Sequence, residues 1–301
     1  LMVSRKWFRL TFLIEKNLED LIIWKLSQLK IAAYAFNFLY GKPNFLKVEI
    51  WLLSTKCTDK YKVKLQKIFK ELLKENNNYS PKFYWNITNE DWLNKWKEFW
   101  SPEQIGKNFV VLPSWINLPK EFANKKVIKI DPGAAFGTGS HPSTSLCLQE
   151  MENIKIYNKK VLDIGCGSGI LTIAAKLLGA NNLHALDNDY LAINSTEENL
   201  KLNFSKTTDF HLYEGSFQEL KDNKSIKDFD LIMCNILADV ISLMIPNISR
   251  VLNLNGKLIL SGILSSQQRE IIKILNLNHL SVDNVSSEKD WVCIKSTKTS
   301  Q

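Results

Sequence analysis

The sequence predicts a two-domain α/β protein, in which a doubly wound, mostly parallel sheet follows a small ferredoxin-like α+β domain. Two observations carry this prediction. An apolar strand at Val161–Ile164 runs into the glycine turn GCGSG and then directly into an apolar helix. Strands and helices alternate from about Lys126 onward, whereas residues 7–87 follow the order β-α-β-β-α-β. We expect the first domain at residues 1–88, a connector at 89–125 and the second domain at 126–301.

The first domain has the periodicities of a split sheet with both helices on one face. Apolar residues alternate along Trp7–Ile14, as in a half-buried strand. Asn17 and Thr58 are suited to cap two helices, because their side chains can accept hydrogen bonds from the first helical N–H groups. Three further strands are expected at Ile31–Tyr40, Phe45–Leu53 and Phe83–Ile87. This domain shows no cluster of catalytic side chains, which favours a recognition module.

In the second domain, six apolar segments are expected to form the strands of one sheet. Most of the segments between them are expected to form helices. The last strand is expected to run antiparallel to the others. The strands are expected near residues 161–164, 183–187, 210–214, 229–234, 257–261 and 291–295. The helices are expected near residues 170–178, 191–202, 237–252 and 267–275. Ligands of such sheets bind outside the carboxyl ends of the strands.

The net charge of the 301-residue chain is +8, and the excess lies in its front half. Residues 1–125 hold 21 Lys and Arg against 12 Asp and Glu, whereas the remainder holds 18 against 19. Because the cations are nearly all lysine, a solvated surface is favoured over a sequence-specific nucleic-acid interface. No run of 18 apolar residues is present, so no membrane partner is expected. The five cysteines form no C-x-x-C pair, which predicts no metal site and favours a reducing, cytoplasmic location.

The glycine turn in the second domain indicates a nucleoside cofactor. Gly165, Gly167 and Gly169 follow Asp163 in the pattern D-x-G-x-G-x-G. In the dinucleotide fingerprint the third glycine comes one residue later, where this chain has Ile170. The early third glycine fits a cofactor without a pyrophosphate, of which S-adenosylmethionine is the commonest. A purely structural turn is the alternative interpretation.

Two polar residues end neighbouring strands at the same edge. Asp187 lies 22 residues beyond Gly165, and its carboxylate can accept hydrogen bonds from both hydroxyl groups of a ribose. Asp189 is expected to be a solvated turn residue. Asn235 ends the strand DLIMC, and its amide could orient the methionine end of the cofactor or the incoming nucleophile. It could equally cap the next helix, and the residues alone leave this open.

A glycine-rich segment, DPGAAFGTGSHPSTSLCL at Asp131–Leu148, precedes the cofactor turn. Gly137 and Gly139 allow a tight loop, and Ser143 or Thr144 could cap the following helix and contact a ligand. Such a loop beside a nucleoside turn can serve as a lid, and an ordinary surface loop is the alternative.

This segment and VLDIGCGSGILTIAA resemble, nearly residue for residue, the signature segments of the PrmA family. These are class I S-adenosylmethionine-dependent methyltransferases that modify ribosomal protein eleven of the large subunit. Segments at Glu90–Trp96, Asn235–Ala238 and Ser261–Leu264 also resemble the family, in the same order. The resemblance implies a Rossmann-like second domain that contacts S-adenosylmethionine through Thr144, Gly165, Asp187 and Asn235. It further implies that the first domain grips the ribosomal protein, free or on the ribosome, while the second methylates lysine side chains and the amino terminus.

Methyl transfer to an amine is an in-line displacement in which positioning supplies much of the catalysis. A lysine with a pKa near 10.4 must first lose its proton, which costs about 4.6 kcal/mol at pH 7. No residue signals a dedicated general base, so the catalytic residues stay unassigned, although Asn235 could accept a hydrogen bond from the amine and aim it.

Two other functions compete with amine methylation of a protein. Enzymes that methylate a nucleobase amine or a glutamine amide hold that planar group with N-P-P-Y, whereas this chain has Asn-Ile-Leu-Ala from Asn235. The other alternative is an RNA- or ribosome-binding protein without activity, which the basic front half would support.

Overall fold

The computed structural model of this chain divides into two compact units, Leu1–Phe99 and Trp100–Gln301. The described residues are 7–29, 31, 33–39, 42–54, 57–77, 81–88, 101–131, 141–220 and 225–300. The sequence motif at Glu90–Trp96 and the glycine-rich part of the predicted loop, residues 132–140, lie outside the described residues.

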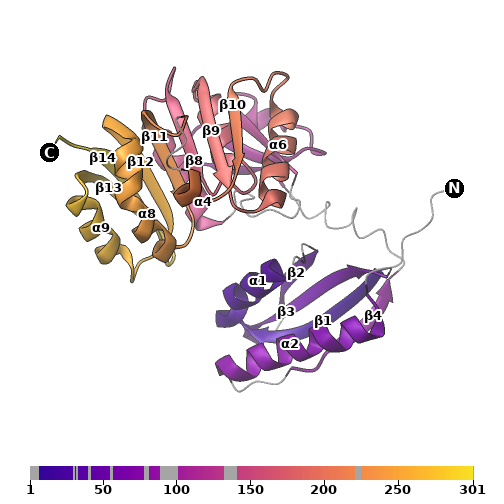
Figure 1. Cartoon of the computed structure of the whole chain (residues 1–301). Coiled ribbons are helices and arrows are strands. Elements are labelled where there is room, and N and C mark those ends of the chain that lie inside the picture. The colour runs from indigo at the N-terminus through magenta and orange to yellow at the C-terminus, as the bar shows by residue number, and fades with distance from the viewer. Residues whose placement is uncertain are drawn as a thin grey trace. The chain divides into compact units, whose positions relative to one another are not determined.

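The first unit is a four-stranded antiparallel sheet with two helices, coloured indigo to purple in Figure 1. Its strands lie in the order β2-β3-β1-β4, which is the order of a ferredoxin-like split sheet and agrees with the prediction. Its elements are β1 (Trp7–Glu15), η1 (Lys16–Leu18), α1 (Glu19–Gln28), β2 (Tyr34–Leu39), β3 (Lys42–Leu53), α2 (Asp59–Asn77) and β4 (Tyr84–Thr88).

Both helices of the first unit pack on one face of its sheet. Alternate residues of β1 are buried in one cluster with the apolar stripes of α1 and α2. The Tyr61 N–H donates to Thr58 Oγ1 at 3.3 Å, so Thr58 caps α2 as the sequence predicts. Asn17 is not a helix cap, because it lies inside the 3-10 turn η1 that leads into α1.

The second unit is built on a seven-stranded sheet in the order β10-β9-β8-β11-β12-β14-β13. The first five of these strands are parallel, and β14 and β13 are antiparallel to their neighbours. The strands are β8 (Lys160–Ile164), β9 (Asn182–Asp187), β10 (Phe210–Glu214), β11 (Phe229–Asn235), β12 (Leu252–Leu264), β13 (Leu280–Glu288) and β14 (Trp291–Lys298). The helices are α4 (Pro142–Met151), α5 (Ile170–Leu177), α6 (Tyr190–Asn203), α7 (Phe217–Leu220), α8 (Ala238–Val251) and α9 (Gln268–Leu277).

A smaller sheet of three strands precedes the large one and belongs to the same unit. Its strand β6 pairs antiparallel with β5 and parallel with β7, so residues 101–125 of the predicted connector are part of the second unit. Its elements are β5 (Glu103–Ile105), β6 (Phe109–Pro113), η2 (Lys120–Phe122) and β7 (Lys126–Ile130).

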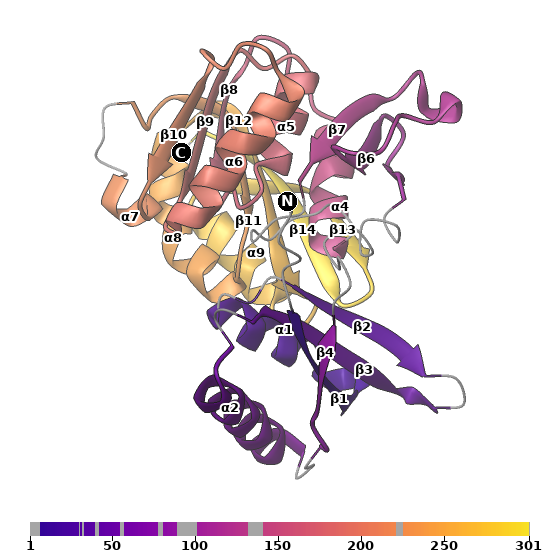
Figure 2. The same ribbon diagram turned by 90° about the vertical axis from the view of Figure 1, so that its right-hand side faces the viewer.

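Helices cover both faces of the large sheet, as Figure 2 shows. Alternate residues of most strands belong to two separate apolar clusters, one with α4 and α5 and the other with α8 and α9. The chain runs from β8 outward to β9 and β10, then crosses back to β11 on the other side of β8. The sheet therefore has its switch point between β8 and β11, which confirms the predicted doubly wound architecture. None of the helices in the described ranges has the length and apolar character that a membrane crossing requires.

Candidate cofactor site

The glycine turn, Gly165–Gly169, follows β8 at the switch point. Its three glycines all have left-handed φ angles, of 73° at Gly165, 55° at Gly167 and 79° at Gly169, which other residues adopt only with strain. The N–H of Gly165 donates to the carbonyl oxygen of Leu186 at 2.8 Å, which ties the turn to the end of β9. A Cβ on Gly165 would lie 2.4 Å from Cγ2 of Ile236, directly after Asn235. The predicted turn therefore brings the carboxyl ends of β8, β9 and β11 together.

Asp187 ends β9 beside this turn. Its Oδ2 accepts a hydrogen bond from the Gly167 N–H at 3.0 Å, and its Oδ1 accepts one from the Asp189 N–H at 3.0 Å. Each carboxylate oxygen has a further lone pair, so the pair of oxygens retains the capacity to accept bonds from two hydroxyl groups. Asp189 differs from its prediction as a simple turn residue, because it caps α6 by accepting from the Leu191 N–H at 2.9 Å.

Asn235 and Thr144 meet across 91 residues of sequence. The Asn235 amide donates from Nδ2 to Thr144 Oγ1 at 3.1 Å, and Thr144 is fully buried. The helix α8 has Leu237 at its N-cap position without a side-chain cap bond, so Asn235 does not cap it. The structure therefore argues against the capping role that the sequence left open for Asn235. Its Oδ1 accepts no hydrogen bond from any described residue.

The N-terminus of α4 brings Thr144 to this position. The sequence predicted Ser143 or Thr144 as the cap, but the cap is His141, whose Nδ1 accepts from the Ser143 N–H at 3.3 Å. The prediction was wrong because Pro142 takes the first helical position, which places the cap at His141, two residues before Ser143. The His141 ring also packs edge-on against Trp291, with 4.8 Å between ring centroids.

Asp163 is a buried carboxylate that the sequence placed next to the turn without giving it a role. The N–H and hydroxyl of Thr172 donate to its Oδ2 at 3.1 and 2.7 Å, whereas its buried Oδ1 has no partner among the described residues. Burial raises the pKa of Asp163 to about 7, and the charge of Asp187 adds to this against the opposing Thr172 bonds. The D-x-G-x-G-x-G pattern was the only sequence signal for Asp163, and it does not reveal that the described residues offer this carboxyl group no cation.

The helix α6 supports the turn from behind through two side chains one helical turn apart. Thr196 Oγ1 donates to the Gly167 carbonyl oxygen at 3.0 Å. Asn199 donates from Nδ2 to the Ser168 carbonyl oxygen at 2.8 Å and accepts at Oδ1 from the Asp131 N–H at 2.8 Å. Sequence reasoning missed both residues, because polar residues on a helix ordinarily mark its solvent face.

These residues suit a nucleoside with a positively charged sulfonium. Two carboxylates, Asp163 and Asp187, lie at an edge where open backbone replaces side chains, and Asn235 presents an unused oxygen beside them. Within the described ranges, His, Cys, Asp and Glu side chains do not gather in threes as they would around a metal ion. The arrangement can therefore hold hydroxyl and ammonium groups through oxygen acceptors. The cofactor roles of Thr144, Gly165, Asp187 and Asn235 stay predictions.

Comparisons with known proteins agree with the sequence motifs. The family model described as ribosomal protein L11 methyltransferase (PrmA) matches residues 6–299. A ribosomal protein L11 methyltransferase of Prochlorococcus marinus strain MIT 9515 is 54% identical over 293 residues, which are 97% of this chain and 98% of that protein. Another from Synechococcus sp. strain RCC307 is 33% identical and covers 96% of both chains. The crystal structure of a ribosomal protein L11 methylase from Lactobacillus delbrueckii subsp. bulgaricus aligns with a TM-score of 0.61 and 32% identity, over 66% of this chain and 99% of that one.

Proposed function

Because the chain belongs to the PrmA family of ribosomal protein L11 methyltransferases, we propose that it transfers methyl groups from S-adenosylmethionine to ribosomal protein L11. The acceptors are lysine side chains and the amino terminus. The observation that supports this function most directly is the Asn235–Thr144 contact beside the glycine turn and Asp187. It places an amide oxygen without a described donor next to the expected cofactor site.

Each residue of the site has a proposed task. Asp187 accepts hydrogen bonds from the two ribose hydroxyl groups, for which its oxygens have free lone pairs. Gly165 keeps the backbone open to the nucleoside, and Thr144 fixes the orientation of the Asn235 amide. The bound cofactor supplies an electrophilic methyl group on sulfur.

Asn235 aims the nucleophile. Its Oδ1 accepts one N–H of the incoming amine, which directs the nitrogen lone pair along the line of displacement. Losing the proton of a lysine costs about 4.6 kcal/mol at pH 7. A site that removes the amine from water and already holds positive charge lowers this cost, because both effects favour the neutral amine. His141 is not assigned as a base, because its Nδ1 is occupied in capping α4.

We infer that the first unit recognises the ribosomal protein and that the reaction takes place in the cytoplasm. Support for the location comes from the five cysteines, all of which are buried free thiols, as is typical of a reducing compartment. Amine-reactive cross-linking of the full chain to L11, mapped by mass spectrometry, tests the recognition role. Cross-links should include residues 7–88, and cross-links confined to the second unit would contradict it.

The function itself is tested by transfer of labelled methyl groups from S-adenosylmethionine to purified L11, with mass mapping of the product. We expect label on lysines and on the amino terminus, and its loss in Asp187→Ala. Label in RNA but not in L11 would overturn the proposed substrate. Failure of the wild-type chain to bind S-adenosylmethionine in calorimetry would overturn the proposed activity.

A further inference from the structure

The helix α4, which carries Thr144 into the site, lies along β14. Three contacts join them in the same order along both elements. The ring of His141 packs on Trp291, the buried side chains of Cys147 and Cys293 belong to the same apolar cluster, and Glu150 Oε2 lies 2.8 Å from Lys295 Nζ. The three β14 residues are two positions apart, so all point to the same face of the sheet.

The spacing of these contacts matches the geometries of helix and strand. From His141 to Glu150 a helix at ~1.5 Å per residue advances about 13 Å. From Trp291 to Lys295 a strand at ~3.3 Å per residue also advances about 13 Å. All three contacts therefore form together at one axial register of α4 and are lost together if the helix slides along the strand.

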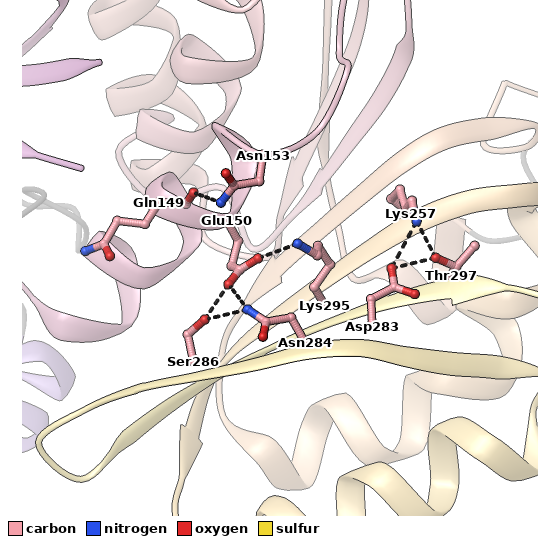
Figure 3. A network of polar contacts seen from close by, with 9 residues as sticks. All are labelled: Gln149, Glu150, Asn153, Lys257, Asp283, Asn284, Ser286, Lys295 and Thr297. Atoms are coloured by element: carbon pink, nitrogen blue, oxygen red, sulfur yellow. Dashed lines mark hydrogen bonds and ion pairs between the residues drawn. The ribbon is translucent and has the colours of Figure 1, made fainter. Parts of the chain in front are cut away.

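The contact at the far end from Thr144 is a buried ion pair with further polar partners, shown in Figure 3. The side chains of Glu150 and Lys295 are only 5% and 15% exposed. Glu150 Oε1 also accepts hydrogen bonds from Asn284 and Ser286 of β13. We name these four residues the α4 clamp. Burying such a pair adds little stability over apolar residues, but it specifies one geometry because both charges need their partners.

The register of α4 decides whether Thr144 meets Asn235. Thr144 lies six residues before Glu150 on the same helix, and its Oγ1 is 3.1 Å from Asn235 Nδ2. A slide by one residue moves the hydroxyl by about 1.5 Å and turns it by about 100°, which breaks a hydrogen bond of this length. We propose that Lys295 and Glu150 are positioning residues, which hold α4 in the register that orients Asn235 for the cofactor and the amine. This rests on the cofactor site proposed above.

The test compares Lys295→Met with a matched control on the same sheet. Lys257 of β12 forms an ion pair with Asp283 at 3.0 Å and a hydrogen bond with Thr297, two residues after Lys295 on β14. In Figure 3 this second group has no bond to α4. Both substitutions remove one lysine from one ion pair, but only Lys295→Met removes an ion pair that holds α4 against β14.

We expect Lys295→Met to raise the dissociation constant for S-adenosylmethionine about fivefold or more, because loss of the Asn235–Thr144 hydrogen bond costs about 1 kcal/mol. Lys257→Met should leave it within about twofold. The Michaelis constant for L11 should not change in either variant. Lys295→Arg, which keeps the charge, should restore most of the affinity. Calorimetry well below both melting temperatures measures these values on folded protein, so a loss of stability alone would not change them.

Two results separate this proposal from the proposed function. If the wild-type chain binds the cofactor and Lys295→Met binds it equally well, the positioning role is wrong and the activity stands. If the wild-type chain does not bind, both are wrong. Should Lys295→Met fail to fold, Glu150→Gln replaces it, because glutamine keeps an oxygen for Asn284 and Ser286 but removes the charge. It should weaken cofactor binding in the same direction, and unchanged binding would overturn the proposal.

Discussion

Two buried carboxylates in the second unit have opposite surroundings. Asp163, beside the glycine turn, is 1% exposed and has two hydrogen bonds from Thr172 but no ion pair with a described residue. Burial raises its pKa to about 7. Glu150, in the α4 clamp, is 4% exposed; burial raises its pKa too, but bonds from Lys295, Ser286 and Asn284 outweigh that effect and leave the pKa below its ordinary value.

The difference lies in the partners, because burial is similar at both places. The clamp supplies its carboxylate with a cation beside Oε2 and two hydrogen bonds at Oε1, although Oε2 has no hydrogen bond besides that ion pair among the described residues. The turn leaves an oxygen of Asp163 without a described partner and keeps three glycines in left-handed conformations. A region that must accept a ligand keeps a buried acid without a described cation and strained backbone at a cost in stability, whereas the clamp pairs its buried charge with Lys295.

The largest effect should appear in the pH dependence of stability. An acid whose folded pKa is raised destabilises the folded state as pH rises from its unfolded pKa to its folded one. For Asp163 the interval runs from 3.8 to about 7. The free energy of unfolding should therefore fall by about 4 kcal/mol over that interval, at ~1.36 kcal/mol per unit. Urea unfolding at several pH values should show that Asp163→Asn removes this fall.

Glu150 should make the free energy of unfolding change with pH in the opposite direction, and Glu150→Gln should remove that change. Because the folded pKa of Glu150 is lowered, its contribution is present above its unfolded pKa and is lost as pH falls below about 4.5. The stability difference between wild type and Glu150→Gln should shrink in acid. If Asp163→Asn and Glu150→Gln changed the pH dependence of the free energy of unfolding in the same direction, the contrast between the turn and the clamp would be wrong.

Asp187→Ala should produce the next largest change. It removes an ionised acceptor of two expected hydroxyl bonds, and hydrogen bonds to charged groups contribute about 1.5–3 kcal/mol each. The dissociation constant for S-adenosylmethionine should rise about 100-fold. Asp189→Ala is the control, since Asp189 only caps α6 and its loss should cost about 1 kcal/mol of stability. If calorimetry found similar affinities for S-adenosylmethionine in both variants, the proposed binding of the ribose by Asp187 would be wrong.

Gly165→Ala tests the strain in the turn. An alanine at φ 73° is strained by about 1–2 kcal/mol, and its Cβ would displace Ile236 Cγ2. We expect about 2 kcal/mol lower stability in urea unfolding, together with weaker cofactor binding. Adding Ile236→Ala removes the clash but not the strain, so the double variant should recover only part of the loss. Full recovery would show that conformational strain at the turn is negligible.

Asn235→Ala should give the smallest of these effects, about a fivefold lower kcat, because one neutral hydrogen bond contributes about 1 kcal/mol. Thr144→Val keeps the amide but removes its acceptor and should lower kcat less. Steady-state assays with L11 as the acceptor measure both. Unchanged turnover in Asn235→Ala would show that its oxygen does not aim the amine.

Periodicity predicted the strands and helices that are apolar on one or both faces, since burial of those faces drives their formation. It missed β13, Leu280–Glu288, because this edge strand is largely polar and exposed. The short β5 and α7 were missed for a different reason, since neither has enough residues to show a period. The PrmA resemblance, taken from the loop and turn motifs, is confirmed by the family model over residues 6–299.

The sequence by itself determined which residues end the parallel strands. Gly165, Asp187 and Asn235 share one edge because the strands are parallel, and that follows from local patterns alone. Only the tertiary structure decided their partners. The Asn235–Thr144 bond, the support of the turn by Asn199 and the alignment of α4 with β14 join residues 31 to 150 positions apart. Side-chain pairing over such separations depends on how the helices pack, and no local periodicity encodes it.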